Sequence, residues 1–247
     1  MMQLQFPTSD ALPNGSVAGR TLCAYTDALT HMETLVSRPR HAPDVLLCVE
    51  HPPTITLGRR GGEDSILGRT LHLPGRTPYP VAVHRIARGG AVTYHAPGQL
   101  VVYPIVQLNQ LDGPLGRGPL GDLGRFVRTM EQCIVATCAR FGLTTMVREG
   151  FSGVWMSETI KLASIGVGVR GGWTFHGLAL NVNPHLAGFD LITPCALPGV
   201  TMTTLWRELE ERGLQPPPYA EVEADLLGRL AGALRRRSGK DPQQNLE

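Results

Sequence analysis

Apolar residues recur at every third or fourth position in four stretches of the chain, a spacing typical of the buried face of an α-helix. Pro39 stops the first stretch, and Gly142 provides a C-terminal stop after the second, which is the most regular of the four. The pattern predicts helices over residues 16–36, 123–141, 203–213 and 219–237.

Shorter apolar runs, bounded by glycine, proline and polar residues, predict β-strands in much of the remaining chain. These runs lie at residues 44–50, 81–85, 99–108, 153–156, 160–169 and 174–181. We expect the second and third runs to form a hairpin-like return around the pair Gly89-Gly90. The pairs Ser157-Glu158 and Gly171-Gly172 are turn signals between the last three strands.

Polar and turn-rich stretches separate these elements. Residues 59–79 are rich in glycine, proline and arginine and predict a long surface loop, and residues 238–247 predict a disordered tail. No segment repeats. Because hairpins outnumber strand–helix–strand crossovers, we expect a single α/β domain over residues 1–237, with a mixed, largely antiparallel central sheet flanked by helices.

Composition and charge narrow the class of protein. Of the 247 residues, 42% are hydrophobic and 18% are charged, which suits one sizeable core. The net charge is only +2 and long basic runs are absent, so we expect no nucleic-acid partner. No apolar run approaches the roughly 20 residues that cross a bilayer, and the chain does not start like a secretory signal. We therefore expect no membrane association.

The five cysteines favour a reducing cytoplasm, because they form neither a disulfide framework nor a CxxC pair for structural zinc. Cys195 differs from the others, since it lies in the constrained segment Pro194-Cys-Ala-Leu-Pro-Gly199, which favours presenting the thiol rather than burying it. The other four stand in periodic apolar surroundings and are predicted to be core residues: Cys23, Cys48, Cys133 and Cys138.

Lys161 is a second candidate for chemistry. It stands at the start of the longest predicted strand, where a lysine is most often a solvated edge charge. A nearby ammonium would favour the thiolate of Cys195 and lower the pKa of its thiol, which is about 8.5 when unperturbed. Spacing along the chain does not show that the two residues meet, so both interpretations of Lys161 stay open here.

The segment from Arg88 to His95 has the polar, aromatic and basic composition of a binding loop. Its glycine pair, Gly89-Gly90, lets backbone amides approach a ligand or stabilise an oxyanion. An ordinary bulged hairpin is the alternative. A nucleotide site is not indicated, because no helix follows Gly166-Val-Gly168 and no Ser or Thr follows a Gly-Lys pair.

Five motifs occur in an order that resembles one known family. They are His51-Pro-Pro-Thr54, Arg88-Gly-Gly-x-x-Thr-Tyr-His-x-Pro-Gly-Gln-Leu-Val101, Lys161-x-x-Ser-Ile-Gly166, Phe175-His-Gly-Leu-Ala-Leu-Asn-Val-Asn183 and Pro194-Cys-x-x-x-Gly-x-x-Met202. Together they are similar to the LipB-type octanoyltransferase family of lipoate biosynthesis. The resemblance covers about residues 45–205, and it implies a fold like the catalytic domains of biotin and lipoate protein ligases.

The resemblance also implies roles for particular residues. Cys195 matches the residue that becomes the acyl-thioester, and Lys161 matches the one that lowers the pKa of that thiol and shuttles protons. Three further strips match substrate-binding positions: Arg88, Gly89, Gly90, Ala91, Val92, Thr93, Tyr94 and His95; Ser164, Ile165 and Gly166; and Gly177, Leu178 and Ala179.

By the same resemblance, the donor is octanoyl-acyl carrier protein, which carries the acyl group on its phosphopantetheine. The acceptors are lysines in the lipoyl domains of 2-oxoacid dehydrogenase E2 subunits and in the glycine cleavage H protein, and no ATP, metal or other cofactor is required. Two rivals remain: an ATP-dependent lipoate or biotin ligase, which needs no nucleophilic cysteine, and a non-catalytic acyl-binding protein. Ala96 and Ala196 stand where the family usually has glycine, which puts the local loop geometry in question.

Overall fold

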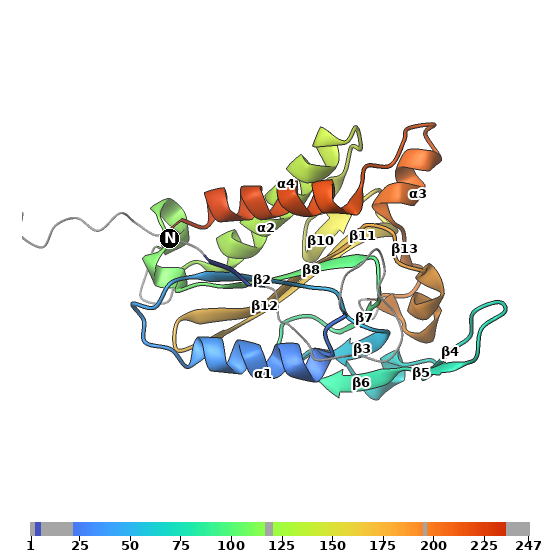
Figure 1. The fold of residues 1–247 in the computed structure, drawn as a ribbon, viewed down its shortest axis with the longest axis horizontal. Helices are drawn as coiled ribbons and strands as arrows, with labels where there is room; N and C mark the ends of the chain where they lie inside the picture. The colour runs from blue at the N-terminus through green and yellow to red at the C-terminus, as the bar shows by residue number, and fades with distance from the viewer. Residues whose placement is uncertain (1–2, 6–21, 117–120, 195–196, 236–247) are drawn as a thin grey trace, which may run out of the picture.

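A mixed eight-stranded sheet forms the centre of the computed structural model, which describes residues 3–5, 22–116, 121–194 and 197–235 (Figure 1). The strand order is β1-β2-β8-β12-β11-β10-β9, with β13 paired to β11 off this path. Only the β1–β2 and β11–β13 pairs are parallel among the described strands of this sheet, so the predicted α/β class with a mixed, largely antiparallel sheet is confirmed. The strands are β1 (Gln3–Gln5), β2 (Val45–Val49), β8 (Gln99–Ile105), β9 (Met146–Arg148), β10 (Phe151–Trp155), β11 (Ile160–Arg170), β12 (Trp173–Asn181) and β13 (Thr201–Met202).

Helices cover both faces of this sheet (Figure 1). Helices α2 (Leu123–Arg140) and α4 (Tyr219–Ala233) lie on one face, and α1 (Tyr25–Val36) lies on the other. Side chains alternate between the faces along β2, so that Leu46 packs in the core beneath α2 and α4 while Leu47 packs in the core against α1. Because both faces are covered, this strand is a continuous apolar run rather than an alternating one.

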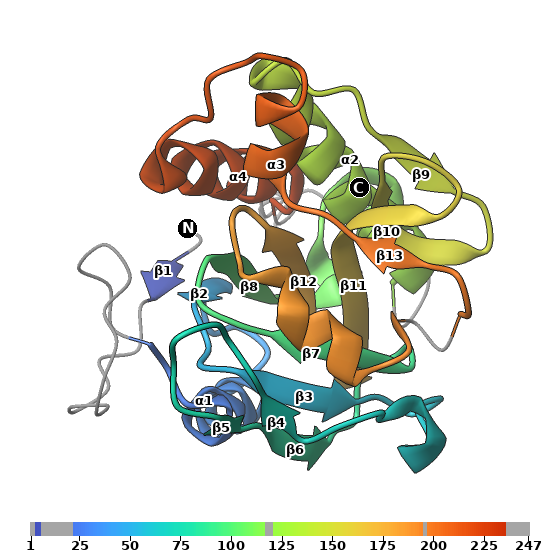
Figure 2. The same cartoon turned by 90° about the vertical axis from the view of Figure 1, so that its right-hand side faces the viewer.

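A second, three-stranded sheet lies beside the large one and contains β3 (Thr54–Leu57), β6 (Ala82–Arg85) and β7 (Val92–His95) (Figure 2). Its central strand, β3, is parallel to β6 and antiparallel to β7. The predicted hairpin between residues 81–85 and 99–108 is therefore wrong. The first segment pairs with β3, which the sequence analysis missed, whereas β8 pairs with β2 and β12 in the large sheet.

The boundaries of several elements differ from the sequence prediction. Helix α1 begins at Tyr25 because the N–H of Cys23 donates to Glu50 O at 2.8 Å, which ties the preceding residues to the end of β2. Residues 16–21, where the prediction placed the start, and the tail 238–247 lie outside the described residues. The predicted loop 59–79 is largely irregular, with a 3-10 turn at Glu63–Ser65 and the small ladder of β4 (Thr70–Leu71) and β5 (Tyr79–Pro80).

The last three predicted strands form the expected antiparallel run β10–β11–β12. Gly171 and Gly172 make the turn between β11 and β12 with φ of +59° and +86°, a conformation that glycine adopts without steric penalty. After β13 comes the short helix α3 (Leu205–Glu210), which lies inside its predicted range. Within the described ranges, no helix combines the length and apolarity needed to span a membrane.

Candidate active site

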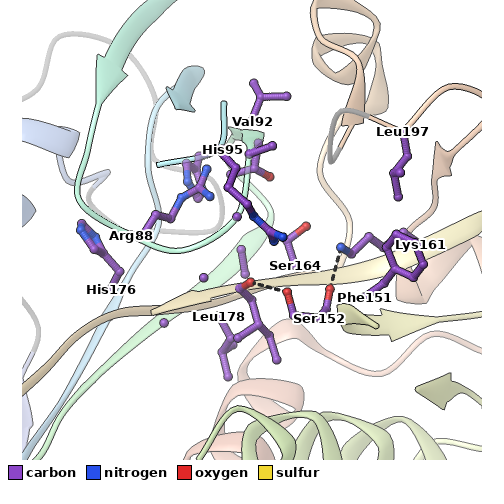
Figure 3. Close-up of a pocket in the computed structure, with 18 of the residues that line it drawn as sticks. Arg88, Val92, His95, Phe151, Ser152, Lys161, Ser164, His176, Leu178 and Leu197 are labelled. Atoms are coloured by element: carbon purple, nitrogen blue, oxygen red, sulfur yellow. Dashed lines mark hydrogen bonds between the residues drawn. The ribbon is translucent and has the colours of Figure 1, made fainter. Parts of the chain in front are cut away.

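A cavity of about 250 Å³ lies where the small sheet meets β11 and β12 (Figure 3). Its wall includes most of the residues that the motifs predicted, although these come from distant parts of the chain. Lys161 and the residues of the three predicted substrate-binding strips line it, with the exception of Gly89 and Tyr94. The lining members are Arg88, Gly90, Ala91, Val92, Thr93, His95, Lys161, Ser164, Ile165, Gly166, Gly177, Leu178 and Ala179.

Two of the three predicted strips lie side by side, because residues 164–166 pair in register with residues 177–179 across the β11–β12 ladder. At one end of this stretch, Gly166 is opposite Gly177. A Cβ on Gly166 would come within 2.7 Å of Gly89 O, and one on Gly177 would come within 2.7 Å of Pro104 Cδ. The absence of side chains at these two lining positions lets neighbouring atoms approach the cavity wall closely.

The two glycines of the strip from Arg88 to His95 have different roles. The N–H of Gly89 donates to Val167 O at 2.9 Å and so joins the small sheet to β11, which leaves Gly90 as the member on the cavity wall. Tyr94 packs in the core of the small sheet, with its ring centroid 5.2 Å from that of Phe189. Gly89 and Tyr94, both predicted to bind substrate, therefore support the loop without lining the cavity.

Lys161 is buried, with only 3% of its surface exposed, so the interpretation as a solvated edge charge is wrong. Strand β11 has neighbours on both sides at this position, because Lys161 is opposite Trp155 of β10 and Met202 of β13. Its Nζ donates to Ser152 O at 2.8 Å (Figure 3). The same atom lies 4.6 Å from the centre of the Trp155 ring. The amine thus reaches the cavity from a fixed position.

Gly153 provides the space for this lysine. It stands in the irregular part of β10 with φ of +116°, and a Cβ there would lie 2.7 Å from Lys161 Cε and would also meet Ala163 O. Only a residue without a side chain fits between these atoms and adopts this φ at low cost. The apolar run at residues 153–156 predicted a strand and indicated no further role for Gly153.

The other end of the cavity is polar. Arg88 donates from Nη2 to Thr56 O at 2.9 Å and from Nη1 to Gly89 O at 2.9 Å, so its guanidinium is held by backbone oxygens. His95 and His176 line the cavity near it, and Nε2 of His176 has no hydrogen-bond partner in the part of the chain that the structure describes. His176 has φ of +56°, an uncommon conformation for a residue other than glycine.

The imidazoles of this end are uncharged near neutral pH. Burial and, to a lesser extent, the positive charge of Arg88 lower the pKa of His176 to about 3. Burial also lowers the pKa of His51, which contacts the lining residue Tyr103, to about 4. The pKa of His95 lies well below its ordinary value for the same principal reason. Several residues of this cavity were not predicted as binding residues, although one of them, His176, lies within a quoted motif. The missed lining residues are Tyr25, Arg60, Tyr103, Gly150, Phe151, Ser152, His176 and Leu197.

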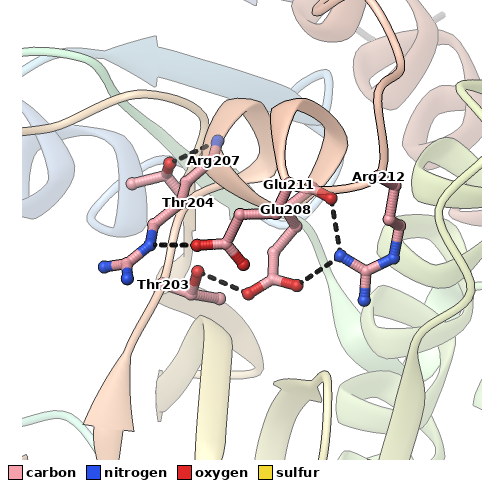
Figure 4. Close-up of polar contacts among 6 residues, drawn as sticks. All are labelled: Thr203, Thr204, Arg207, Glu208, Glu211 and Arg212. Carbon is pink, nitrogen blue, oxygen red and sulfur yellow. Dashed lines mark hydrogen bonds and ion pairs between the residues drawn. The ribbon is translucent and has the colours of Figure 1, made fainter.

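The chain returns to Lys161 after the segment that contains Cys195. The N–H of Thr203 donates to Lys161 O at 3.0 Å, directly after the β13 pairing. The Thr203 hydroxyl donates to Glu208 at 2.7 Å, and Arg212 forms an ion pair with the same carboxylate at 2.7 Å (Figure 4). These contacts fix the start of α3 against the strand that carries the lysine.

Cys195 and Ala196 lie outside the described residues. On the far side of that gap, Leu197 lines the cavity and donates its N–H to Pro194 O at 3.0 Å. The four cysteines predicted to be core residues are buried, which confirms that prediction. Burial raises the thiol pKa of Cys23 and Cys133 to about 11 and that of Cys138 to about 12, so these thiols are almost entirely protonated near neutral pH.

Among the residues with described positions, no group of three or more His, Cys, Asp or Glu side chains is arranged to hold a metal ion.

The chain is similar to proteins of one family over most of its length. Residues 24–231 match the family described as lipoyl protein ligase A/B catalytic domain. An octanoyltransferase from Chloroflexus aurantiacus is 43% identical over 189 residues, which are 76% of this chain and 78% of that protein. An octanoyltransferase from Syntrophotalea carbinolica is 42% identical over 205 residues, which are 82% of this chain and 86% of that protein.

Solved structures share the fold at much lower sequence identity. A putative lipoate protein ligase from T. acidophilum with bound lipoic acid has a TM-score of 0.58 and 15% identity, over 87% of this chain and 84% of that one. A lipoate-protein ligase A bound with ATP has a TM-score of 0.59 and 15% identity, over 86% and 83% of the two chains. These likenesses confirm the predicted ligase-like fold.

The family match places the chain in the class of proteins that contain a lipoyl protein ligase A/B catalytic domain. Within this class, the chain belongs to the octanoyltransferase family, as the five motifs predicted.

Proposed function

We propose that this enzyme transfers an octanoyl group from acyl carrier protein to a lysine of a lipoyl domain through a thioester on Cys195. The observation that carries the proposal is the buried amine of Lys161 on the cavity wall, held at 2.8 Å by Ser152 O. Leu197 lines the same cavity.

The first step exchanges one thioester for another. The Cys195 thiolate attacks the carbonyl carbon of the donor thioester, the bond to the carrier sulfur breaks, and that sulfur leaves as a thiol after taking up a proton. A positively charged Lys161 stabilises the attacking thiolate and supplies this proton. Little driving force is needed, since a thioester is lost and a thioester is formed.

The second step forms an amide. The uncharged amine of the target lysine attacks the Cys195 thioester, the carbon–sulfur bond breaks, and the proton lost by the amine passes through Lys161 to the leaving thiolate. An amide is more stable than a thioester, so the step proceeds without ATP. The amide N–H of Gly90 on the cavity wall is a candidate for stabilising the oxyanion.

The donor and acceptors follow from the family. We propose octanoyl on the phosphopantetheine of acyl carrier protein as the donor, and lipoyl domains of 2-oxoacid dehydrogenase E2 subunits and the glycine cleavage H protein as acceptors, in the cytoplasm and without a metal or other cofactor. The apolar side chains of Val92, Ile165 and Leu178 on the cavity wall suit an acyl chain.

Intact-mass measurement after mixing with octanoyl-acyl carrier protein tests the proposal. We expect one octanoyl adduct that maps to Cys195 and is removed by hydroxylamine, which cleaves thioesters and spares amides. Cys195→Ala should remove the adduct, whereas Cys133→Ala should keep it. An adduct on another cysteine, or transfer that requires ATP and free octanoate, would contradict the proposal, and the second result would indicate a ligase.

A further inference from the structure

One peptide group in β10 lies between a buried carboxylate and the amine of Lys161. The carbonyl oxygen of Ser152 accepts from Lys161 Nζ at 2.8 Å, and the N–H of the next residue, Gly153, donates to Glu131 Oε1 at 2.8 Å. Both groups belong to the same peptide unit. A negative charge at its N–H and a positive charge at its C=O both favour the same orientation of the peptide dipole, and each strengthens the other hydrogen bond.

The sheet does not fix this peptide by regular pairing. The register of β10 shifts against β9 between Phe151 and Val154, and against β11 between Val154 and Trp155. Gly153 adopts φ of +116° inside this irregular stretch. A bulge leaves backbone groups outside the ladder, so another partner has to set their direction. Glu131 from α2 is that partner.

Glu131 is unusual for a helix residue that packs on a sheet. It is only 2% exposed, and a buried carboxylate costs free energy unless it is paired and hydrogen-bonded. Its second oxygen forms an ion pair with Arg128 at 2.7 Å. Burial raises the Glu131 pKa, while the Gly153 amide, Arg128 and Lys161 lower it. Its side chain does not line the cavity over β11 and β12.

We infer that Glu131 is a positioning residue, which holds the Ser152–Gly153 peptide so that its carbonyl fixes the amine of Lys161 at the cavity. The inference rests on the proposed role of Lys161. Glu131 acts through the backbone and touches no substrate. The charged groups around this segment include Glu131 and Arg128 on α2 and Lys161 itself. Arg148 on β9 has its guanidinium 5.2 Å from the Trp155 ring centre and forms an ion pair with Glu158 at 2.7 Å.

Two substitutions separate the hydrogen bond from the charge. Glu131→Gln keeps an oxygen that accepts from Gly153, whereas Glu131→Leu removes it. We expect Glu131→Leu to lower single-turnover octanoyl transfer by about 100-fold, the effect of a displacement of about 1 Å in a catalytic group. The pH midpoint of Cys195 alkylation by iodoacetamide should move toward that of Lys161→Ala. Glu131→Gln should retain most of the parent's transfer rate and a pH midpoint of alkylation close to that of the parent.

Glu223→Leu is the matched control. Glu223 is a buried glutamate on α4 that accepts from Cys48 Sγ at 3.2 Å and does not line the cavity. Its replacement should change the thermal stability while the alkylation midpoint stays at the parent value. If Glu131→Leu does not fold, Glu131→Asp replaces it, because aspartate keeps the charge but is one methylene too short to reach the Gly153 amide in the same way.

Three results decide the matter. A folded Glu131→Leu or Glu131→Asp variant with the parent midpoint and transfer rate overturns the inference. Equal losses in Glu131→Gln and Glu131→Leu also overturn it, because glutamine retains the acceptor. Failure of the proposed function looks different, since Lys161→Ala itself would then leave the midpoint and the transfer rate unchanged.

Discussion

Replacing Gly153 with alanine tests whether the position of the Lys161 amine sets the rate of acyl transfer. The new Cβ would lie 2.7 Å from Lys161 Cε and 3.1 Å from its Nζ. Non-bonded carbon atoms pack at about 3.5–4.0 Å, so the lysine side chain has to move by about 1 Å. A displacement of this size lowers a rate by about 100-fold. The φ of +116° adds backbone strain of about 1–3 kcal/mol.

The assay is single-turnover octanoyl transfer to a lipoyl domain, with thermal unfolding measured on the same preparations. Gly171→Ala is the matched control, because Gly171 also has a positive φ, of +59°, but no atom lies within 4 Å of its built Cβ. We expect both variants to lose stability and only Gly153→Ala to lose transfer. A folded Gly153→Ala variant that transfers as fast as Gly171→Ala refutes the reasoning.

Lys161→Arg keeps the charge but cannot act as a base near neutral pH, so we expect partial alkylation of Cys195 and poor transfer. Lys161→Ala should lose both the rapid alkylation of Cys195 and the acyl transfer. A parent-like dependence of alkylation on pH in that variant would exclude the mechanism. Because burial lowers the pKa of His51 from 6.5 to about 4, the unfolded chain binds a proton in this window that the folded chain does not, and stability should fall as pH drops from about 6.5 to about 4. The loss from this residue is at most about 3 kcal/mol, and thermal unfolding against pH should show a shallower slope in His51→Gln. Thr203→Val removes the donor to Glu208, so urea unfolding should show a loss of about 1–3 kcal/mol, and an unchanged midpoint would contradict that role.

Local patterns predicted the part of the fold that depends on neighbours in the chain. The β11–β12 hairpin follows from two apolar runs joined by Gly171-Gly172, and α2 follows from its regular apolar spacing and Gly142. The small sheet could not be predicted in this way. Its ladder joins β3 to β6 and β7 across an irregular stretch, and four residues of β3 carry too weak a pattern to show which partner they take.

The site was predicted as a set of residues but not as an arrangement. The motifs named Lys161, yet its burial depends on Gly153 in the neighbouring strand and on the Ser152 carbonyl, which no spacing rule connects to it. Glu131 lies on a helix whose apolar stripe gives no reason to expect a buried carboxylate at that position. Such contacts depend on a bulge, and bulges leave little trace in a pattern of apolar and polar positions.

The close contact between the small sheet and β11 determines which parts of the protein can move to admit a substrate. Gly89 donates to Val167 O and packs against Gly166, so the two sheets cannot separate here without breaking this hydrogen bond. Entry of an acyl chain therefore falls to side chains at the rim, such as Phe151, which is 36% exposed, and Leu197. Because Gly166 and Gly177 already lack side chains, an engineer who wants a bulkier acyl group has to shorten the larger side chains of the wall, such as Ile165 and Leu178.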